Sequence, residues 1–242
     1  MKPYTHFEFS GRFLKNYDRF NHLASMGLDR RWRRVTAGRA AAYYQQRGWN
    51  APVLDLACGT GDMAAAIHQV LQAVVIGSDP SAEMLDLAAD KKKRCGWSRF
   101  HPVRAVSRLP LADASVGAVT CAFGVRNFVR LQQDMDECRR VLQPGGRIYL
   151  LDFYKPQNRF SHGVLQIYKK IIAPAVGALI TGQAKPYRYL MESMYAFRTP
   201  QAMMEVLTVS GLQAVDIHPF FFGLVHLVVA EKKIYSPQGE TT

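Results

Sequence analysis

Short apolar runs alternate with amphipathic stretches along the middle of the 242-residue chain. Such runs are typical of strands in a parallel sheet, and the stretches between them have the spacing of helices that cover the sheet. The pattern therefore predicts an α/β fold with a mostly parallel sheet. The predicted strands are residues 53–57, 74–78, 101–106, 118–123 and 147–153, and the predicted helices between them are 63–71, 82–93 and 132–142.

Two segments lie outside this alternation. Residues 1–50 predict two basic helices, which form an N-terminal helical cap before a core domain at 51–242. Residues 154–199 carry an apolar stripe and an aromatic-rich stretch, and they predict a helical lid inserted over the carboxyl edge of the sheet. The last predicted elements complete the sheet with an antiparallel closing strand: a helix at 200–210 and strands at 214–219 and 224–230.

The formal net charge of +12 is compatible with nucleic acid, a membrane surface or acidic substrates. No stretch interleaves aromatic and basic residues as RNA-binding modules do, so we expect no nucleic-acid partner. The four cysteines lack metal-ligand spacing and predict reduced thiols in a cytoplasmic protein, with no metal site. No apolar run reaches the roughly 18 residues of a membrane helix, which leaves peripheral contact with a membrane.

Arginines crowd the second predicted helix of the cap. One interpretation is a solvated face whose aliphatic stems cover apolar surface. The other is a patch that faces anions or lipid headgroups. The residues concerned are Arg30, Arg31, Arg33, Arg34 and Arg39.

A glycine-rich turn, Gly59-Thr60-Gly61, follows the first predicted strand. Glycines at such a turn let the backbone approach a ligand closely and present N–H groups to it. Asp79 ends the second predicted strand, 20 residues after the first glycine, and its two oxygens suit the hydroxyls of a ribose. Asp55 and Asp62 flank the turn with negative charge, which is unfavourable beside a pyrophosphate. The turn therefore favours a cationic adenosine cofactor over NAD.

Two of these carboxylates have structural alternatives. Asp79 followed by Pro80 is also a pattern for capping a helix whose first residue is that proline, and this role is compatible with cofactor binding. Asp62 is equally explained as a charge at the N-terminus of the following helix.

Several motifs resemble known families. Asp55 to Gly61 resembles the glycine-rich motif of Rossmann-like S-adenosylmethionine (SAM) methyltransferases, and Leu109-Pro110-Leu111 with Asp113, together with Arg140 to Arg147, resembles two further segments of these enzymes. Three stretches resemble signatures of the UbiE family of ubiquinone and menaquinone C-methyltransferases. They are Tyr17–Asn21 continuing through Gly27–Trp32, Phe123–Asn127, and Tyr187–Ser193.

The resemblance implies a Rossmann-like fold, SAM as the cofactor and a lipophilic prenylated benzoquinol or naphthoquinol as the methyl acceptor. It implies that Gly59, Thr60 and Gly61 wrap the amino-acid part of SAM. It further implies that Asp55 lies near the ammonium group of SAM and Asp79 on its ribose.

The adenine end of the implied pocket departs from the family pattern. A polar residue of the third-strand segment is Ala105 here, followed by Val106, and a serine before the fourth-strand signature is Ala122. Each missing side chain would weaken adenine recognition by about 1 kcal/mol unless backbone groups at Val106 replace it.

Carbon methylation of a quinol requires that the phenol lose its proton and that the developing oxyanion be stabilised. The resemblance implies Arg126, Asn127 and Tyr17 as the catalytic group. Arginine is a poor base at its ordinary pKa, so Arg126 is predicted to stabilise the oxyanion or order a water. The alternative for this arginine is a structural ion pair or a carbonyl contact. His22 and Tyr187 are further candidates for proton transfer.

Other functions stay open on the sequence. One is a phospholipid or other small-molecule N- or O-methyltransferase with the same core, and another is a scaffold that has lost SAM affinity, which Ala105 and Ala122 would permit. An oligomer is compatible with the sequence. Side chains of the predicted lid either line a substrate channel or form core: Tyr189, Met191, Met194, Tyr195 and Phe197.

Overall fold

The computed structural model describes residues 17–105, 108–168, 170 and 192–234. Its centre is a seven-stranded sheet. The strands are β1 (Val53–Leu56), β2 (Val75–Asp79), β3 (Phe100–Arg104), β4 (Val116–Ala122), β5 (Leu142–Phe153), β6 (Leu212–Phe220) and β7 (Val225–Lys232). They lie in the order β3-β2-β1-β4-β5-β7-β6, and within this sheet only β7 runs antiparallel to its neighbours. The predicted α/β fold with an antiparallel closing strand is confirmed.

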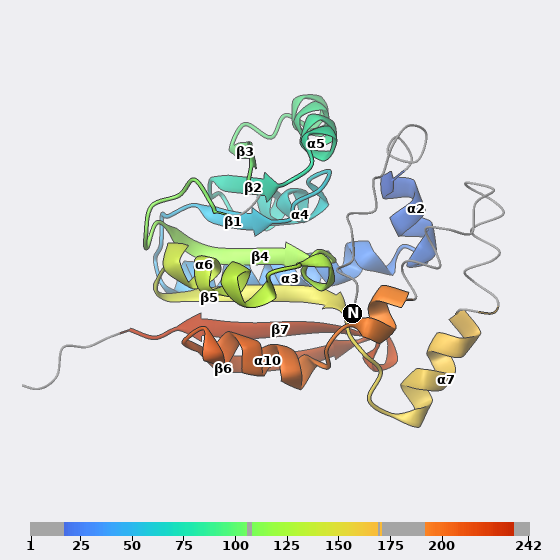
Figure 1. The fold of residues 1–242 in the computed structure, drawn as a ribbon. Helices are drawn as coiled ribbons and strands as arrows, with labels where there is room; N and C mark the ends of the chain where they lie inside the picture. Colours follow the sequence, from blue (N-terminus) through green and yellow to red (C-terminus); the bar gives the residue numbers. More distant parts are fainter. Residues whose placement is uncertain (1–16, 106–107, 169, 171–191, 235–242) are drawn as a thin grey trace, which may run out of the picture.

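Helices cover both faces of the sheet (Figure 1). They are α2 (Tyr17–Ala24), α3 (Leu28–Gln46), α4 (Asp62–Val70), α5 (Ala82–Cys95), α6 (Leu131–Val141), α7 (Arg159–Ile167) and α10 (Pro200–Val209), with short 3-10 helices η1 (Val125–Asn127) and η3 (Phe221–Gly223). One core lies between the sheet and α3 with α4, and a second lies between the sheet and α6 with α10.

Successive side chains of β5 point alternately into the two cores. Ile148 and Leu150 are buried against α6 and α10, whereas Tyr149 and Leu151 are buried on the side of α3 and α4. Successive side chains of a strand point to opposite faces, so a strand covered on both faces is apolar at every position. This explains why the sequence pattern shows continuous apolar runs rather than alternation.

Two element boundaries differ from the predictions. The predicted strand 147–153 starts earlier, because β5 begins at Leu142, includes Pro144, Gly145 and Gly146, and shifts register against β4. Such an irregularity absorbs extra residues while the backbone stays in the sheet. Within the predicted helical segment 154–199, helix α7 begins only at Arg159, where Asn158 and Ser161 form a capping box.

A third cluster joins the N-terminal helix to the insertion after β5. Phe20 and Ala24 of α2 pack with Leu165 of α7 and with Tyr168 and Met194. Helix α3 instead packs in the same core as α4. The boundary predicted at residue 50 therefore separates elements that share a core, and the division into cap, domain and lid stays a prediction.

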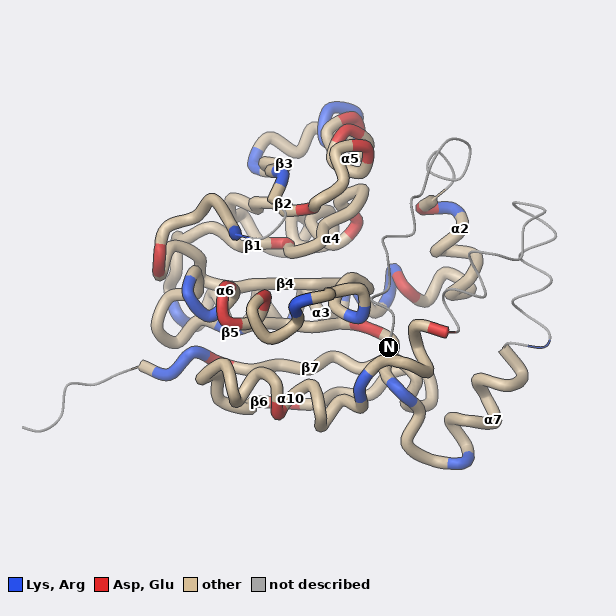
Figure 2. Tube along the Cα trace, viewed as in Figure 1, with Lys and Arg blue, Asp and Glu red and all other residues tan. Residues whose placement is uncertain are grey.

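Lysine and arginine positions are spread over several elements rather than gathered on α3 (Figure 2). Arg33 of that helix is buried and pairs with Asp29, and Arg39 pairs with Asp216 of β6. The other three, Arg30, Arg31 and Arg34, are exposed, so both interpretations of the α3 arginines stay predictions. Among the described residues, the helices are too short or too polar to cross a membrane.

Candidate active site

A cavity of about 760 Å³ opens where β1, β2 and β4 end. Its walls come from α2, the start of α3, the glycine-rich turn, the segment after β2, the segment from β4 into η1, and Tyr168 after α7. Ligands of open α/β sheets bind at this carboxyl edge, and the volume is within the range of small-molecule sites.

The glycine-rich turn forms one wall of this cavity. Gly59 and Gly61 have φ angles of 52° and 86°, in the left-handed region that favours glycine. Gly61 is the N-cap of α4, and as a glycine it supplies no side-chain hydrogen bond to the helix there. The N–H groups of a helix's first turn lack partners within the helix, so they suit an incoming polar or anionic group.

Asp79 is held beside the turn by two backbone groups. Its Oδ2 accepts a hydrogen bond of 2.9 Å from the N–H of Gly59, and its Oδ1 accepts one of 2.9 Å from the N–H of Ser81. Burial raises the pKa of this carboxyl, which lines the cavity. The capping alternative for Asp79 is wrong, because Ser81 is the N-cap of α5 and the helix begins at Ala82, beyond Pro80.

Arg126 also lines the cavity and is fixed by a buried carboxylate. Its Nη1 donates to Oδ1 of Asp152 at 2.6 Å and to the carbonyl of Phe123 at 2.7 Å. The backbone N–H of Arg126 donates to Oδ2 of Asp152 at 3.1 Å, and the N–H of Phe153 donates to its Oδ1 at 2.8 Å. Both structural contacts predicted as alternatives for this arginine are present, and they hold its guanidinium at the cavity.

The other predicted catalytic residues line the same cavity. Tyr17 begins α2, and Asn127 ends η1 one residue after Arg126. Burial raises the pKa of the Tyr17 phenol, so the group stays protonated near neutral pH. A protonated phenol donates a hydrogen bond, whereas it would be a poor base.

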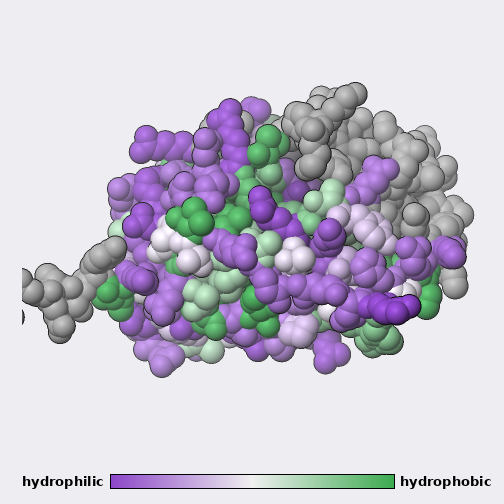
Figure 3. All heavy atoms as spheres, turned by 60° about the horizontal axis from the view of Figure 1, so that its bottom comes forward, coloured by the Kyte–Doolittle hydropathy of each residue, from purple (hydrophilic) through white to green (hydrophobic). Residues whose placement is uncertain are grey.

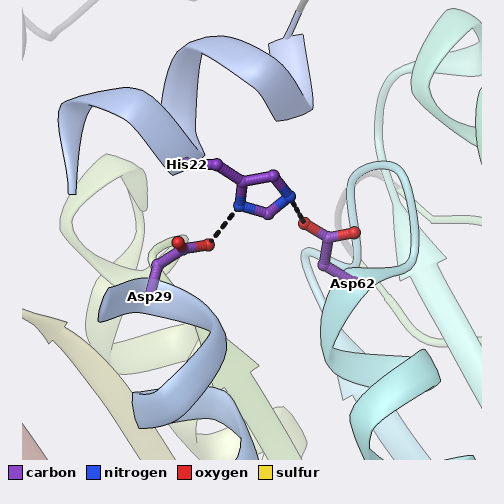
Figure 4. Close-up of side chains that lie close together, drawn as sticks. All are labelled: His22, Asp29 and Asp62. Carbon is purple, nitrogen blue, oxygen red and sulfur yellow. Dashed lines mark hydrogen bonds and ion pairs between the residues drawn. The ribbon is translucent and has the colours of Figure 1, made fainter. Parts of the chain in front are cut away.

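His22 connects three helices at the rim of the cavity (Figure 4). Its Nδ1 lies 2.8 Å from Oδ2 of Asp29 on α3, and its Nε2 lies 3.8 Å from Oδ2 of Asp62 on α4. Burial opposes ionisation of Asp29, but the hydrogen bond from His22 and the charge of Arg33 hold its pKa below its ordinary range. The three groups offer metal-ligand atoms within 4.8 Å of one another. Because Asp29 and Asp62 already pair with basic side chains, we assign no metal there.

Lys91 of α5 ties α2 to the glycine-rich turn. Its Nζ donates to Asp18 and to Asp62 at 2.6 Å each, and to Oγ1 of Thr60 at 3.2 Å. Asp18 also accepts a hydrogen bond from the Thr60 hydroxyl. Asp62 is the first residue of α4, so it combines the predicted helix-terminal charge with an ion pair.

The sequence profile of the ubiE/COQ5 methyltransferase family matches residues 8–232. The chain belongs to this family. Demethylmenaquinone methyltransferases of Deinococcus radiodurans and Chlorobaculum parvum are 40% and 37% identical to it, over 90% and 89% of this chain and 88% of each relative.

Solved structures share the fold. A SAM-dependent methyltransferase from Aquifex aeolicus matches with a TM-score of 0.57 at 16% identity, over 79% of this chain and 88% of that one. A protein from Methanococcus maripaludis matches with a TM-score of 0.60 at 16% identity, over 96% of this chain and all of that one. The chain is thus a UbiE-family methyltransferase with the Rossmann-like fold, and family and fold imply the use of SAM.

Asp55 of this UbiE-family chain lies inside the sheet rather than on the cavity wall. Its side chain is fully buried, and its Oδ1 accepts a hydrogen bond of 3.0 Å from the hydroxyl of Thr120 on β4. Its Oδ2 has no hydrogen-bond partner among the described residues, and burial raises the pKa of Asp55 to about 7. Its contact with an ammonium group stays a prediction.

Of the residues predicted at the adenine end, one lines the cavity and another lies at the end of β3. Ala122 ends β4 and lines the cavity. Ala105 follows β3 and donates its N–H to the carbonyl of Asp79 at 3.3 Å. Val106 lies outside the described residues. Pro80 and Met84 add apolar surface beyond Asp79. The sequence analysis did not predict that Pro80 and Met84 line the cavity. Their position shortly after Asp79, at the end of a strand, could have indicated it.

Asp152 is the main residue that the sequence reasoning missed. It ends the apolar run of β5, and a lone carboxylate at the carboxyl end of a buried strand is a signal for the active-site edge. Among the lid candidates, Met194 and Phe197 pack in the cores and do not line the cavity. Tyr187, Tyr189 and Met191 lie outside the described residues.

Proposed function

We propose that this UbiE-family methyltransferase transfers a methyl group from SAM to a ring carbon of a lipophilic prenylated quinol, with a naphthoquinol favoured over a benzoquinol. The observation that carries the proposal is one cavity that both Asp79 and Arg126 line, with Arg126 held by the buried carboxylate of Asp152. The name of the similar proteins, demethylmenaquinone methyltransferase, supports the naphthoquinol.

The residues of one wall fit SAM. Asp79 is anchored by one backbone N–H on each oxygen, and each oxygen keeps acceptor capacity for a ribose hydroxyl. The N–H groups of the uncapped first turn of α4, preceded by Gly59, Thr60 and Gly61, suit the carboxylate of its amino-acid part. When bound, SAM supplies an electrophilic methyl group on a sulfonium.

Base recognition would rely on shape rather than on the two absent polar side chains. Pro80 and Met84 provide an apolar surface on which a flat base can pack, and Ala122 leaves room on the β4 side. The weakening inferred from Ala105 and Ala122 is therefore offset in part by contact area.

The residues around Arg126 suit an aromatic acceptor that becomes negatively charged. Arg126 is always protonated, and Asp152 with the Phe123 carbonyl fixes its orientation before an acceptor binds. Preorganised donors of this kind stabilise a developing phenolate without reorganisation. Tyr17 and Asn127 add polar groups on the same side, and the Phe123, Phe128 and Phe153 side chains give the apolar walls that a quinol ring and its tail require.

Methyl transfer to two acceptors tests the proposal. The purified chain is incubated with SAM labelled on its methyl group and with either a short-tailed demethylated naphthoquinol in detergent or phosphatidylethanolamine. We expect label in the quinol ring and none in the phospholipid. Label in phosphatidylethanolamine instead would support the N-methyltransferase alternative and overturn the acceptor assignment.

Calorimetry with SAM separates an enzyme from a scaffold. We expect binding that Asp79→Ala abolishes and Arg126→Ala leaves intact, because Asp79 is bonded to the glycine-rich turn whereas Arg126 lies in η1 after β4. The absence of binding at millimolar SAM would favour a scaffold that has lost the cofactor. Retained turnover in Arg126→Ala would remove this arginine from the catalytic group.

A further inference from the structure

Helix α7 has two apolar faces, and only one of them is covered. The inner face buries Leu165, and Tyr168 just beyond the helix donates its hydroxyl to the carbonyl of Ala24 on α2 at 2.7 Å. The outer face carries Phe160, which is 65% exposed, and Ile167, which is 58% exposed. With the half-buried Val164, these side chains form a stripe at helical spacing.

The 3-10 helix η3 extends this stripe with a further aromatic ring. Phe222 is 60% exposed, and its ring lies 5.6 Å from the ring of Phe160 in an edge-on arrangement. Phe221 and Phe222 have φ angles of 41° and 56°, an unfavourable region for bulky side chains. The fold therefore retains a strained backbone where it presents a large apolar ring to solvent. We call Phe160, Val164, Ile167 and Phe222 the α7 face.

Exposed basic residues flank helix α7 along the chain. Lys155 precedes α7, Arg159 is its first residue, and Lys170 follows it. Arg198 lies beside Lys155, because the backbone N–H of Lys155 donates to the carbonyl of Arg198. Glu192 is the one acidic residue in the described segments 153–168, 170 and 192–200. Figure 2 shows basic positions at the start of α7 and near the start of α10. Figure 3 shows hydrophobic side chains reaching the surface at the right-hand end, where Figure 1 draws α7.

We propose that the α7 face docks on a membrane surface that contains anionic lipid. Aromatic and aliphatic side chains enter the headgroup boundary while flanking lysine and arginine side chains attract anionic headgroups. A protein partner with an apolar groove would not need the four basic residues at its edge. The link to catalysis rests on the proposed function: the same helix leads into Tyr168, which lines the cavity, so a lipophilic acceptor would reach the site from the docked side.

Vesicle partition of the full chain tests this proposal without SAM or acceptor. The vesicles contain phosphatidylcholine alone or phosphatidylcholine mixed with phosphatidylglycerol. We expect binding to the anionic vesicles, reduced at least about ten-fold by Phe160→Gln with Phe222→Asn. Asparagine is chosen at position 222 because it tolerates a left-handed backbone. The control is Val129→Gln with Val209→Gln, which removes two apolar side chains elsewhere that are at least about as exposed, and it should leave binding unchanged.

A charge pair gives a second comparison. Lys155→Gln with Arg159→Gln should weaken binding to anionic vesicles about five-fold for each charge, whereas Lys93→Gln with Arg94→Gln at the end of α5 should have little effect. Equal losses in the test and control variants, or no loss with Phe160→Gln and Phe222→Asn, would overturn the proposal. The proposal would also be overturned if the unaltered protein forms a dimer and the variant with Phe160→Gln and Phe222→Asn does not, because the α7 face would then be an interface between copies. None of these outcomes affects the methyl-transfer assay in detergent, so failure here is distinguishable from failure of the proposed function.

Discussion

Replacing Asp152 with asparagine tests whether the buried carboxylate sets the position of Arg126. Asp152 is 0% exposed and accepts three hydrogen bonds within its pocket in addition to the charge interaction: one from the Arg126 side chain, one from the Arg126 backbone and one from the Phe153 backbone. Asparagine has nearly the same shape, but its NH₂ group is a donor and would face a donor already present. The guanidinium would then be left without its buried counter-charge.

The magnitude follows from the burial of both partners. The Arg126 side chain is 10% exposed, so water compensates little for the lost ion pair. Removing one partner of a buried pair typically costs about 3–5 kcal/mol, and we expect about 3 kcal/mol in the free energy of unfolding because asparagine keeps one acceptor. A guanidinium that is displaced from the site would lower kcat by about 100-fold, the usual effect of losing one preorganised donor.

A double-mutant cycle provides the assay. The free energy of unfolding in urea is measured for Asp152→Asn, Arg126→Gln and the double variant, and a coupling energy of about 2–3 kcal/mol is expected for residues in direct contact. SAM affinity, measured by calorimetry, should change little in Asp152→Asn. Additive effects on stability, or full turnover in Asp152→Asn, would refute the reasoning that this pair fixes the catalytic arginine.

Three further predictions concern Asp79, Asp55 and Lys91. Asp79→Asn should weaken SAM binding about 100-fold, because the amide offers one acceptor oxygen where the carboxylate offers two, and an unchanged Kd by calorimetry would contradict the ribose role. Burial raises the pKa of Asp55 from 3.8 to about 7, so the folded state loses stability as pH rises through that window. Asp55→Asn should therefore flatten the pH dependence of the free energy of unfolding. An unchanged slope would argue against a buried neutral carboxyl. Lys91→Met should lower the free energy of unfolding by about 1–2 kcal/mol, while Lys93→Met on the same helix should not, and equal effects in urea titrations would exclude a specific tie to α2.

The parts of this molecule that the sequence predicted are those specified by neighbouring residues. Apolar runs identified the central strands, since a strand buried on both faces has few polar positions. The glycine-rich turn and Asp79 were identified because their conformation and chemistry are local to a strand end. The predicted start of the next helix at residue 82 is correct, and Ser81 caps it; only the alternative cap at Asp79 was wrong.

The contacts that sequence reasoning missed are long-range. Asp152 meets Arg126 only because β5 pairs with β4, and a strand order is not contained in the pattern of either strand. Lys91 meets Asp18 across 73 residues of chain, through the packing of α5 and α2 around the turn. A lysine near the end of a helix has an adequate local explanation in the helix dipole, so nothing in its neighbourhood pointed to the turn.

The strand order also has a consequence for synthesis of the protein. The residues that line the cavity lie between positions 17 and 168, whereas β6 and β7 come from positions 212–232. Until these last strands leave the ribosome, the edge of β5 from Arg147 to Phe153 has no β7 to pair with. An apolar edge strand without a partner is a template for aggregation, so the nascent chain passes through a stage with a nearly complete site and an unprotected sheet. Truncations after α10 would hold the chain at that stage, and we expect them to depend on chaperones for solubility.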